Sequence, residues 1–296
     1  MKDIFNEKNI KPMLLEETYK PFNDKNYIYE LKFDGIRALI YVSKKDITII
    51  SRRGNILNKT FPELLEIKNN ITNKCIFDGE IVLMEDSKPS FQKLQERMRL
   101  KNENKINYYK ENYPVTFVCF DILYENKDLT KLPLIKRKEI LSHYEDNNLF
   151  IKSKVVEDGI KLFNFVKKNN LEGIVAKLKS SEYIIGKRTK NWLKVKNIKE
   201  DDYIIGAYQE KEFVITLAMG KLINNQLHFI SKVTIGKKHP DYQLIKLCKK
   251  TKNKFLDFNE EDYIYIEPKY TCTIIYLEKT KDGHLRHPVF KNIRNN

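Results

Sequence analysis

Lys32 stands at the end of an alternating apolar run, YIYELK, and is followed by Asp34 and Arg37. A lone lysine at a strand end is usually a solvated residue, and such a spacing can arise by chance. An amine becomes a nucleophile, however, when nearby positive charge and desolvation favour its neutral form. Arg37 supplies a positive charge and Phe33 an apolar neighbour. These residue types raise the hypothesis of covalent catalysis through Lys32.

Two lysines and two glutamates later in the chain could surround such a nucleophile. Lys194 and Lys196 alternate with apolar residues, so both side chains lie on the same face of a strand. Glu80 and Glu172 each adjoin a glycine at the end of an apolar run, although either could be an ordinary turn residue. Their carboxylate oxygens suit Mg²⁺ or Mn²⁺. We expect these lysines and a bound metal to favour the neutral amine of Lys32.

The elements that must position these residues are short strands. The pattern predicts two strands around a tight Asp-Gly turn over residues 27–42. Further strands are predicted over residues 47–55, 75–84, 115–124, 171–178 and 191–196.

Three helices are predicted between these strands. They cover residues 90–100 with Ser90 as N-cap, residues 133–144 with Pro133 in the first turn, and residues 157–170. The last of them places Ile160, Phe163 and Val166 on one face. Helices and strands are mixed rather than strictly alternating, which predicts an α+β fold.

A change of sequence character near residue 198 predicts two domains, residues 1–198 and 199–296. The second part is dominated by strand-like runs such as YIIGAY, FVITLAMGKL and LHFISKVTIG. Five or so strands of this length fit a small Greek-key β-barrel, with residues 242–255 as its helix.

Composition points to a folded protein with a polyanionic partner. The 296 residues, 41% of them hydrophobic, suffice for two cores, and the formal net charge is +15. Nucleic acid is favoured over membrane because no basic amphipathic helix or lipidation signal occurs, although abundant Lys, Asn and Ile also suit a protein from an AT-rich genome. Without a signal peptide or a long apolar run, we expect a cytoplasmic location, and association with the nucleoid if the source is bacterial.

The cysteines and histidines do not form a recognisable metal pattern. Cys75, Cys119, Cys248 and Cys272 are far apart, so we expect reduced thiols rather than disulfides or structural zinc. The five histidines lack ligand spacing, which makes a transition-metal site improbable.

An ordered series of motifs gives the chemical residues one interpretation. The series is KFDGIR at 32–37, SRRG at 51–54, FDGE at 77–80, FDIL at 120–123, EGIVAK at 172–177 and WLKVK at 192–196. In this order the motifs resemble those of covalent nucleotidyltransferases, the superfamily of DNA ligases, RNA ligases and mRNA capping enzymes. Flanking segments such as KPMLLEETYKPF look most like the ligase module of bacterial end-joining ligases. The resemblance covers nearly the whole chain.

The resemblance implies a minimal ATP-dependent DNA ligase, with a nucleotidyltransferase (adenylation) domain followed by an OB-fold domain. It implies that Lys32 takes AMP from ATP and that the AMP passes to the 5′-phosphate at a nick. The 3′-hydroxyl then displaces AMP and seals the strand, with magnesium (or manganese) serving each step. The implied partner is nicked double-stranded DNA, in DNA repair, end joining or replication. We expect a monomer, with end-joining or repair proteins as further partners.

The resemblance also implies roles for the metal and phosphate residues. In the family, the position of Glu80 lies by the nucleotide ribose and the metal, and that of Glu172 helps to hold the metal. The lysines matching Lys194 and Lys196 grip the α-phosphate, to which Arg37 adds positive charge.

Other positions are implied to contact the base and the DNA. Phe120, which could equally be ordinary core, matches the wall on which adenine stacks, and Glu30 matches a contact to the base edge. Arg52 matches an arginine that grips nick phosphates, whereas its neighbour Arg53 is expected to be solvated. Arg188 is a plausible further phosphate contact.

One departure and two alternatives stay open. LRHPVFKNIR at 285–294 resembles the start of the family's last motif, but Asn295 and Asn296 follow where the family has Asp and Lys nearby. We expect slow self-adenylylation, or compensation by a lysine such as Lys291. The alternatives are an RNA-directed relative, either an RNA ligase or a GTP-using capping enzyme, and a non-catalytic nucleic-acid clamp.

Overall fold

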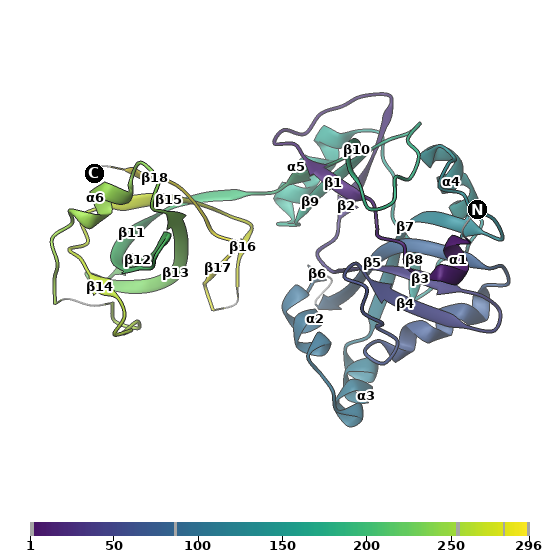
Figure 1. The fold of residues 1–296 in the computed structure, drawn as a ribbon, viewed down its shortest axis with the longest axis horizontal. Coiled ribbons are helices and arrows are strands. Elements are labelled where there is room, and N and C mark those ends of the chain that lie inside the picture. The colour runs from purple at the N-terminus through teal and green to yellow at the C-terminus, as the bar shows by residue number, and fades with distance from the viewer. Residues whose placement is uncertain (1–2, 86–87, 253–254, 281, 295–296) are drawn as a thin grey trace. The chain divides into compact units, whose positions relative to one another are not determined.

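The computed structural model describes residues 3–85, 88–252, 255–280 and 282–294, so Asn295 and Asn296 lie outside the described residues. The chain folds as two compact units, Met1–Lys196 and Asn197–Asn296 (Figure 1). Within the described residues, no helix is long and apolar enough to cross a membrane. Sheets and helices are mixed in the first unit, which confirms the predicted α+β class.

The larger sheet of the first unit has the strand order β4-β3-β5-β7-β8, with β6 beside β5. Its strands are β3 (Ile36–Val42), β4 (Ile47–Ser51), β5 (Cys75–Glu85), β6 (Lys88–Pro89), β7 (Val115–Glu125) and β8 (Phe150–Lys152). All neighbours are antiparallel except β7 and β8. Ile40, Phe77 and Phe117 are fully buried in one large core, which explains the apolar runs that predicted these strands.

The smaller sheet has the order β1-β10-β9-β2. Its strands are β1 (Leu14–Glu17), β2 (Tyr27–Lys32), β9 (Gly173–Leu178) and β10 (Arg188–Lys196). β1 runs parallel to β10, and the other pairs are antiparallel. Tyr29, Ile174 and Val195 share a core with Phe163 of the neighbouring helix α5.

β2 and β3 do not form the hairpin that a tight Asp-Gly turn suggested, because they belong to different sheets. The chain crosses from one sheet to the other at Asp34-Gly35. A Cβ at Gly35 would lie 2.3 Å from the carbonyl oxygen of Ile81 on β5, so the crossing passes too close to β5 for any side chain. The prediction of two strands was right, and their pairing was wrong.

Short helices flank the two sheets (Figure 1). They are α1 (Ile4–Glu7), α2 (Phe91–Met98), α3 (Glu103–Asn112), α4 (Leu134–Ser142), α5 (Gly159–Lys168) and the 3₁₀ helix η1 (Pro62–Asn70). Ser90 precedes α2 as predicted, but its hydroxyl donates to Glu85 and caps no backbone amide. Ile160 is 44% exposed, because only Phe163 and Val166 of the predicted apolar face of α5 reach the core.

The second unit is one sheet with the order β13-β12-β11-β15-β18, and β14 beside β11. The strands are β11 (Lys199–Glu210), β12 (Val214–Ile223), β13 (Gln226–Gly236), β14 (Ile264–Tyr265), β15 (Thr271–Tyr276) and β18 (Val289–Arg294). β13 and β18, the two ends of this order, contact each other, so the sheet closes into the predicted barrel. A small hairpin of β16 (Glu278–Lys279) and β17 (Leu285–Arg286) completes the unit.

Helix α6 (Tyr242–Lys246) is much shorter than the helix predicted over residues 242–255. The chain after α6 pairs with the barrel instead, because Lys250 forms a β-bridge with Ile266. The thiols of all four cysteines are free, and three of them are buried in the cores.

A buried ion pair ties α4 to the larger sheet. The guanidinium of Arg137 donates two hydrogen bonds of 2.8 Å to the carboxylate of Asp121 on β7, and both side chains are fully buried. The same guanidinium also donates to the backbone carbonyls of Leu132 and Ser181. Such a pair holds its elements in register, because either charge without the other would be stranded away from water.

Arg137→Met should destabilise the first unit by about 3–5 kcal/mol, because it leaves the carboxylate of Asp121 buried without its partner. The measurement is denaturant unfolding followed by the fluorescence of Trp192, the chain's single tryptophan, which is buried in the same unit. The matched control is Lys136→Met, one position away on α4, whose surface pair with Glu139 should contribute under about 1 kcal/mol. Equal losses in the two variants would contradict this role.

Candidate active site

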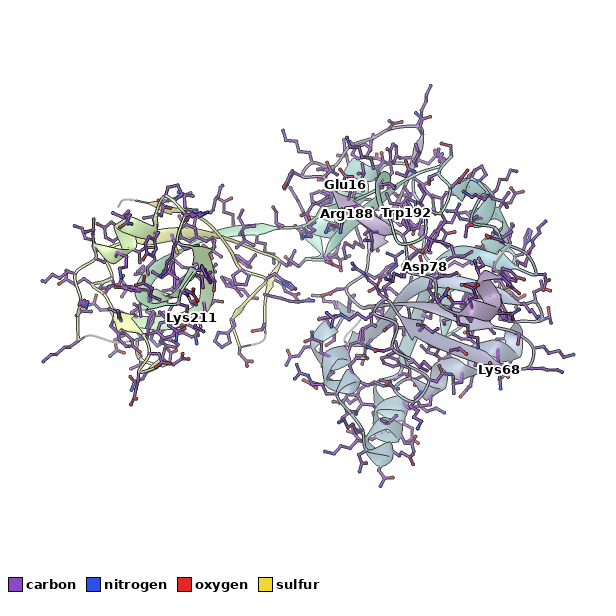
Figure 2. All side chains as sticks on the ribbon, in the orientation of Figure 1. Glu16, Lys68, Asp78, Arg188, Trp192 and Lys211 are labelled. Carbon is purple, nitrogen blue, oxygen red and sulfur yellow. The ribbon has the colours of Figure 1, made fainter. Side chains whose placement is uncertain are left out.

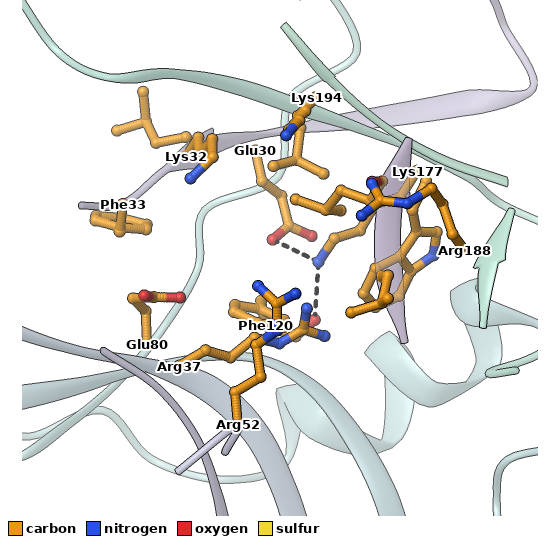
Figure 3. A pocket seen from close by; sticks show the side chains of 15 residues that line it. Glu30, Lys32, Phe33, Arg37, Arg52, Glu80, Phe120, Lys177, Arg188 and Lys194 are labelled. Carbon is orange, nitrogen blue, oxygen red and sulfur yellow. Dashed lines mark hydrogen bonds and ion pairs between the residues drawn. The ribbon is translucent and has the colours of Figure 1, made fainter. Parts of the chain in front are cut away.

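A pocket in the first unit collects side chains from both sheets (Figure 3). Strands β2, β9 and β10 supply one wall, and β3, β5 and β7 supply the other. The lining residues are Leu14, Leu15, Glu30, Leu31, Lys32, Phe33, Arg37, Arg52, Glu80, Phe120, Val175, Lys177, Arg188, Trp192 and Lys194. Most of the residues proposed from the sequence thus share one pocket. Glu172 and Lys196 are not among the lining residues, but each forms an ion pair close to it.

Lys32 forms an ion pair with Glu172, with 2.6 Å between Nζ and Oε1. The antiparallel register of β2 and β9 places Lys32 opposite Gly173, the first residue of β9, and Glu172 directly precedes this strand. Gly173 is required here, since a Cβ would lie 2.2 Å from the carbonyl oxygen of Val195. The sequence did not predict this ion pair, which involves the amine proposed as the nucleophile.

Glu80 lies in the middle of β5, opposite Arg37 of β3, and not at a strand end as the sequence suggested. Burial raises the pKa of its carboxyl to about 8, and the negative charges of Glu172 and Asp78 act in the same direction. The positive charges of Lys32 and Arg37 only partly offset this effect. At neutral pH this carboxyl is therefore mostly protonated, and a nearby cation would favour its ionised form.

Glu80 and Glu172 suit a magnesium site that has only two protein ligands. In the part of the chain that the structure describes, no three His, Cys, Asp or Glu residues are placed to hold a metal ion. Mg²⁺ commonly takes only one or two protein carboxylates and fills its remaining positions with water and substrate phosphates. Glu80 and Glu172 meet that smaller requirement.

Glu17 bridges the two lysines of β10. Its carboxylate oxygens lie 3.1 Å from Nζ of Lys194 and 3.1 Å from Nζ of Lys196, so the lysines do share one strand face. Burial alone would raise the pKa of Glu17, but hydrogen bonds from Lys196 and Lys194 lower it below the usual value. The parallel pairing of β1 with β10 produces this contact, which the sequence did not predict.

Arg37 is held by a buried carboxylate, Asp78. Two hydrogen bonds of 3.0 and 2.7 Å join the guanidinium to Asp78, which also accepts a 2.6 Å hydrogen bond from the hydroxyl of Tyr183. Asp78 lies inside the first unit (Figure 2) and is fully buried. The guanidinium then lies 5.2 Å from the centre of the Phe120 ring. Asp78 belongs to the FDGE motif, so the sequence carried a signal for it that the prediction did not use.

At one end of the pocket, the ring of Phe120 lies beside the ion pair of Lys177 and Glu30. Nζ of Lys177 lies 4.3 Å from the centre of the Phe120 ring and 3.1 Å from Oε2 of Glu30 (Figure 3). Burial lowers the pKa of Lys177 to about 8. Lys177 is the last residue of the EGIVAK motif, but no role was predicted for it. Glu30 also pairs with Lys138, which lies outside the pocket lining.

Two arginines lie at the pocket. Arg52 follows β4 and is exposed, as is its neighbour Arg53, which does not line the pocket. Arg188 begins β10, and its guanidinium donates to the carbonyl of Leu15.

The segment that resembles the last family motif lies in the second unit, in β17 and β18. There Lys291 pairs with Glu200, and Arg294 pairs with Asp202.

Two family models match the chain. The ATP dependent DNA ligase domain matches residues 11–196, and the ATP dependent DNA ligase C terminal region matches residues 204–296. These ranges correspond to the two compact units.

Several characterised proteins are similar over most of this chain. The SPbeta prophage-derived DNA ligase-like protein LigB of Bacillus subtilis is 31% identical, over 96% of this chain and 99% of that protein. The multifunctional non-homologous end joining protein LigD of Mycolicibacterium smegmatis is 27% identical, over 99% of this chain but 40% of its own length. A DNA ligase of Archaeoglobus fulgidus is 29% identical, over 90% of this chain and 51% of its own length.

The fold has solved counterparts. The structure described as mycobacterial DNA ligase D complexed with ATP and MES superimposes with a TM-score of 0.61, at 22% identity, over 100% of this chain and 97% of that one. The ligase domain of Mycobacterium tuberculosis LigD gives a TM-score of 0.60, also at 22% identity, over 99% of this chain and 96% of that one. The two units are thus a nucleotidyltransferase domain and an OB-fold domain.

Lys177→Met should flatten the rise of stability with pH in alkaline solution. The ammonium of Lys177 loses its proton near pH 8 in the folded protein but near 10.5 when unfolded. The unfolded state binds more protons between these values, so the free energy of unfolding rises with pH there, by up to about 1.4 kcal/mol per pH unit. This contribution is complete above about pH 10.5 and is lost as the pH falls through about 8.

The measurement is denaturant unfolding, followed by Trp192 fluorescence, at several values between about pH 8 and pH 10. The wild-type protein and the Lys136→Met control should share the steeper slope. An unchanged slope in Lys177→Met would show that the charge of Lys177 is not strained by burial.

Proposed function

The chain belongs to the family of ATP-dependent DNA ligases, and on that premise we propose that it seals nicks in double-stranded DNA through an AMP held on Lys32. The observation that carries this proposal is the pocket in which Lys32 lies with cations, the carboxyl of Glu80 and an aromatic wall, while Glu172 pairs with Lys32 beside it. Self-adenylylation needs these four kinds of group.

In the first step, Nζ of Lys32 attacks the α-phosphorus of ATP. A nitrogen–phosphorus bond forms, the bond to the bridging oxygen breaks, and pyrophosphate leaves. The amine must be unprotonated to attack, so the ion pair with Glu172 has to open first. Lys32 is freed when the Glu172 carboxylate takes another partner.

Glu80 and Glu172 would hold a magnesium ion, and ATP phosphates would supply further oxygens. The metal supplies charge neutralisation at the phosphates when it is bound. Glu80 would then lose the proton that burial otherwise keeps on its carboxyl.

Lys194 and Lys196 are suited to bind the α-phosphate, because Glu17 shows that one anion can contact both amines. Arg37 is fixed at the Phe120 ring by Asp78, where it can donate to the nucleotide. Phe120 is the proposed wall for adenine, with Glu30 at the base edge.

In the later steps AMP passes from Lys32 to the 5′-phosphate of a nick, and the 3′-hydroxyl then displaces AMP to form the phosphodiester bond. We infer that Arg52 and Arg188, which line the pocket, bind nick phosphates. The net charge of +15 supports a polyanionic substrate whose affinity falls as salt rises. Similarity to an end-joining LigD supports a role in end joining or repair. A monomer with end-joining or repair proteins as partners is part of the proposal.

Lys32→Ala should abolish covalent labelling. The purified protein is incubated with magnesium and α-labelled ATP or GTP, and then run on a denaturing gel. Label is expected from ATP only, and it should move to the DNA when a nicked duplex is added. Lys25→Ala, an exposed lysine close by in sequence, is the control that should keep full labelling. Transfer from GTP alone would instead indicate a capping enzyme, and label retained by Lys32→Ala would exclude this nucleophile.

Arg52→Ala should separate the two halves of the reaction. Because Arg52 is proposed to bind the nick rather than ATP, enzyme–AMP formation should stay near the wild-type rate while sealing falls about tenfold or more. Arg53→Ala, which changes the adjacent exposed arginine outside the pocket, should affect neither step. A loss of labelling equal to the loss of sealing in Arg52→Ala would place Arg52 in nucleotide binding instead.

A further inference from the structure

We propose that Lys138 is a positioning residue that fixes the Glu30 carboxylate and thereby makes the pocket select a purine with an amino group at position 6 over one with an oxygen there. The inference rests on the proposed function, since it concerns the nucleotide that Lys32 would attack. Lys138 lies on α4 and is not among the residues that line the pocket, so its effect must pass through Glu30.

Glu30 is clamped between two lysines from different elements. Its Oε1 lies 2.6 Å from Nζ of Lys138, and its Oε2 lies 3.1 Å from Nζ of Lys177. Glu30 is 2% exposed, so neither lysine can be replaced by water as a partner. Burial alone would raise the pKa of Glu30, but the charges of Lys138 and Lys177 outweigh burial and lower it. The carboxylate is therefore ionised and held from two sides.

The ionisation state of Glu30 determines whether its carboxyl can bind a hydrogen-bond donor or an acceptor on the base. An ionised carboxylate only accepts hydrogen bonds, whereas a protonated one can also donate. At position 6, adenine presents an amino donor, whereas hypoxanthine and guanine present an oxo acceptor that an ionised carboxylate repels; a carboxylate fixed opposite position 6 therefore does not reach the N1–H donor of the 6-oxopurines. The carboxylate has about four lone-pair directions, so contacts to Lys138, Lys177 and Ser153 still leave one for the amino group of the base.

Lys138 is the more permanent of the two partners. Lys177 also lies against the Phe120 ring and 4.4 Å from the centre of the Trp192 ring, so a base that stacks on Phe120 competes for the space Lys177 occupies. Lys138 does not line the pocket, so a base bound there does not displace it. Next to Lys138 on α4, Arg137 forms its buried pair with Asp121, the residue that follows Phe120 in the chain. This pair anchors α4 to the strand that carries Phe120. Lys138 thus keeps Glu30 ionised while the base enters.

The experiment measures KM and kcat for covalent labelling of the full chain with ATP, inosine triphosphate and purine riboside triphosphate. Purine riboside carries hydrogen at position 6 and so tests loss of the amino group without adding an oxygen. The wild-type protein should favour ATP over both probes. Lys138→Met should reduce the preference for ATP over inosine triphosphate by about tenfold, mainly through KM, because the charge-assisted contact is weakened. Lys138→Arg should restore the preference.

Controls separate positioning from a general structural role. Lys136→Met, the exposed neighbour on α4, should keep the wild-type preference. In a Glu30→Gln background, adding Lys138→Met should cause no further loss of preference, because the carboxylate it positions is gone. This double variant also lacks the stranded carboxylate, so it remains testable if Lys138→Met alone does not fold.

Two outcomes would overturn the inference. In the first, Lys138→Met lowers labelling by all three nucleotides equally and leaves the preference intact. In the second, Lys138→Met and Glu30→Gln reduce the preference independently, so that their effects add in the double variant. Failure of the wild-type protein to take label from any nucleotide, with no AMP already attached, would count against the proposed function instead.

Discussion

Opposite charges that leave water together are the constraint on which the first unit depends. An unpaired charge is costly inside a protein, so each buried arginine or lysine fixes the position of a carboxylate. Arg137 with Asp121 joins a helix to the larger sheet, and Arg37 with Asp78 joins two neighbouring strands and reaches Tyr183 of a distant loop. Ion pairs of the same kind occur at the pocket, where they determine which charged side chains are available to contact a substrate.

Local apolar patterns were enough to predict most strands of the first unit, and the motif series pointed to many of the residues that line the pocket. Apolar runs such as CIFDGEIVLM mark strands whatever their neighbours are. The pairing of strands is a different matter, because it depends on contacts between distant segments. Residues 27–42 do form two strands, yet a close approach at Gly35 sends the second strand into another sheet.

The partners of the pocket residues were beyond the reach of the sequence for the same reason. Lys177 and Glu30 are 147 positions apart, and only the register of β2 and β9 brings them together. Lys138 has no motif of its own and reads as one more lysine in a basic helix. The helix predicted over residues 242–255 failed because barrel pairing at Lys250 overrides local helix preference. Side-chain types indicate which chemistry is possible, whereas contacts in the folded protein determine which of these side chains are charged.

Glu17 gives Lys194 and Lys196, the lysines proposed to bind phosphate, a built-in counter-ion. With its carboxylate in place, Lys194 and Lys196 are already neutralised in part, so an incoming phosphate exchanges one anion for another. The net free energy of that exchange is the difference between how strongly the two anions interact with the lysines. Monovalent anions therefore compete poorly with Glu17, whereas multiply charged polyphosphates have an advantage. The carboxylate of Glu17 thus reduces the binding of ordinary monovalent anions to these two lysines.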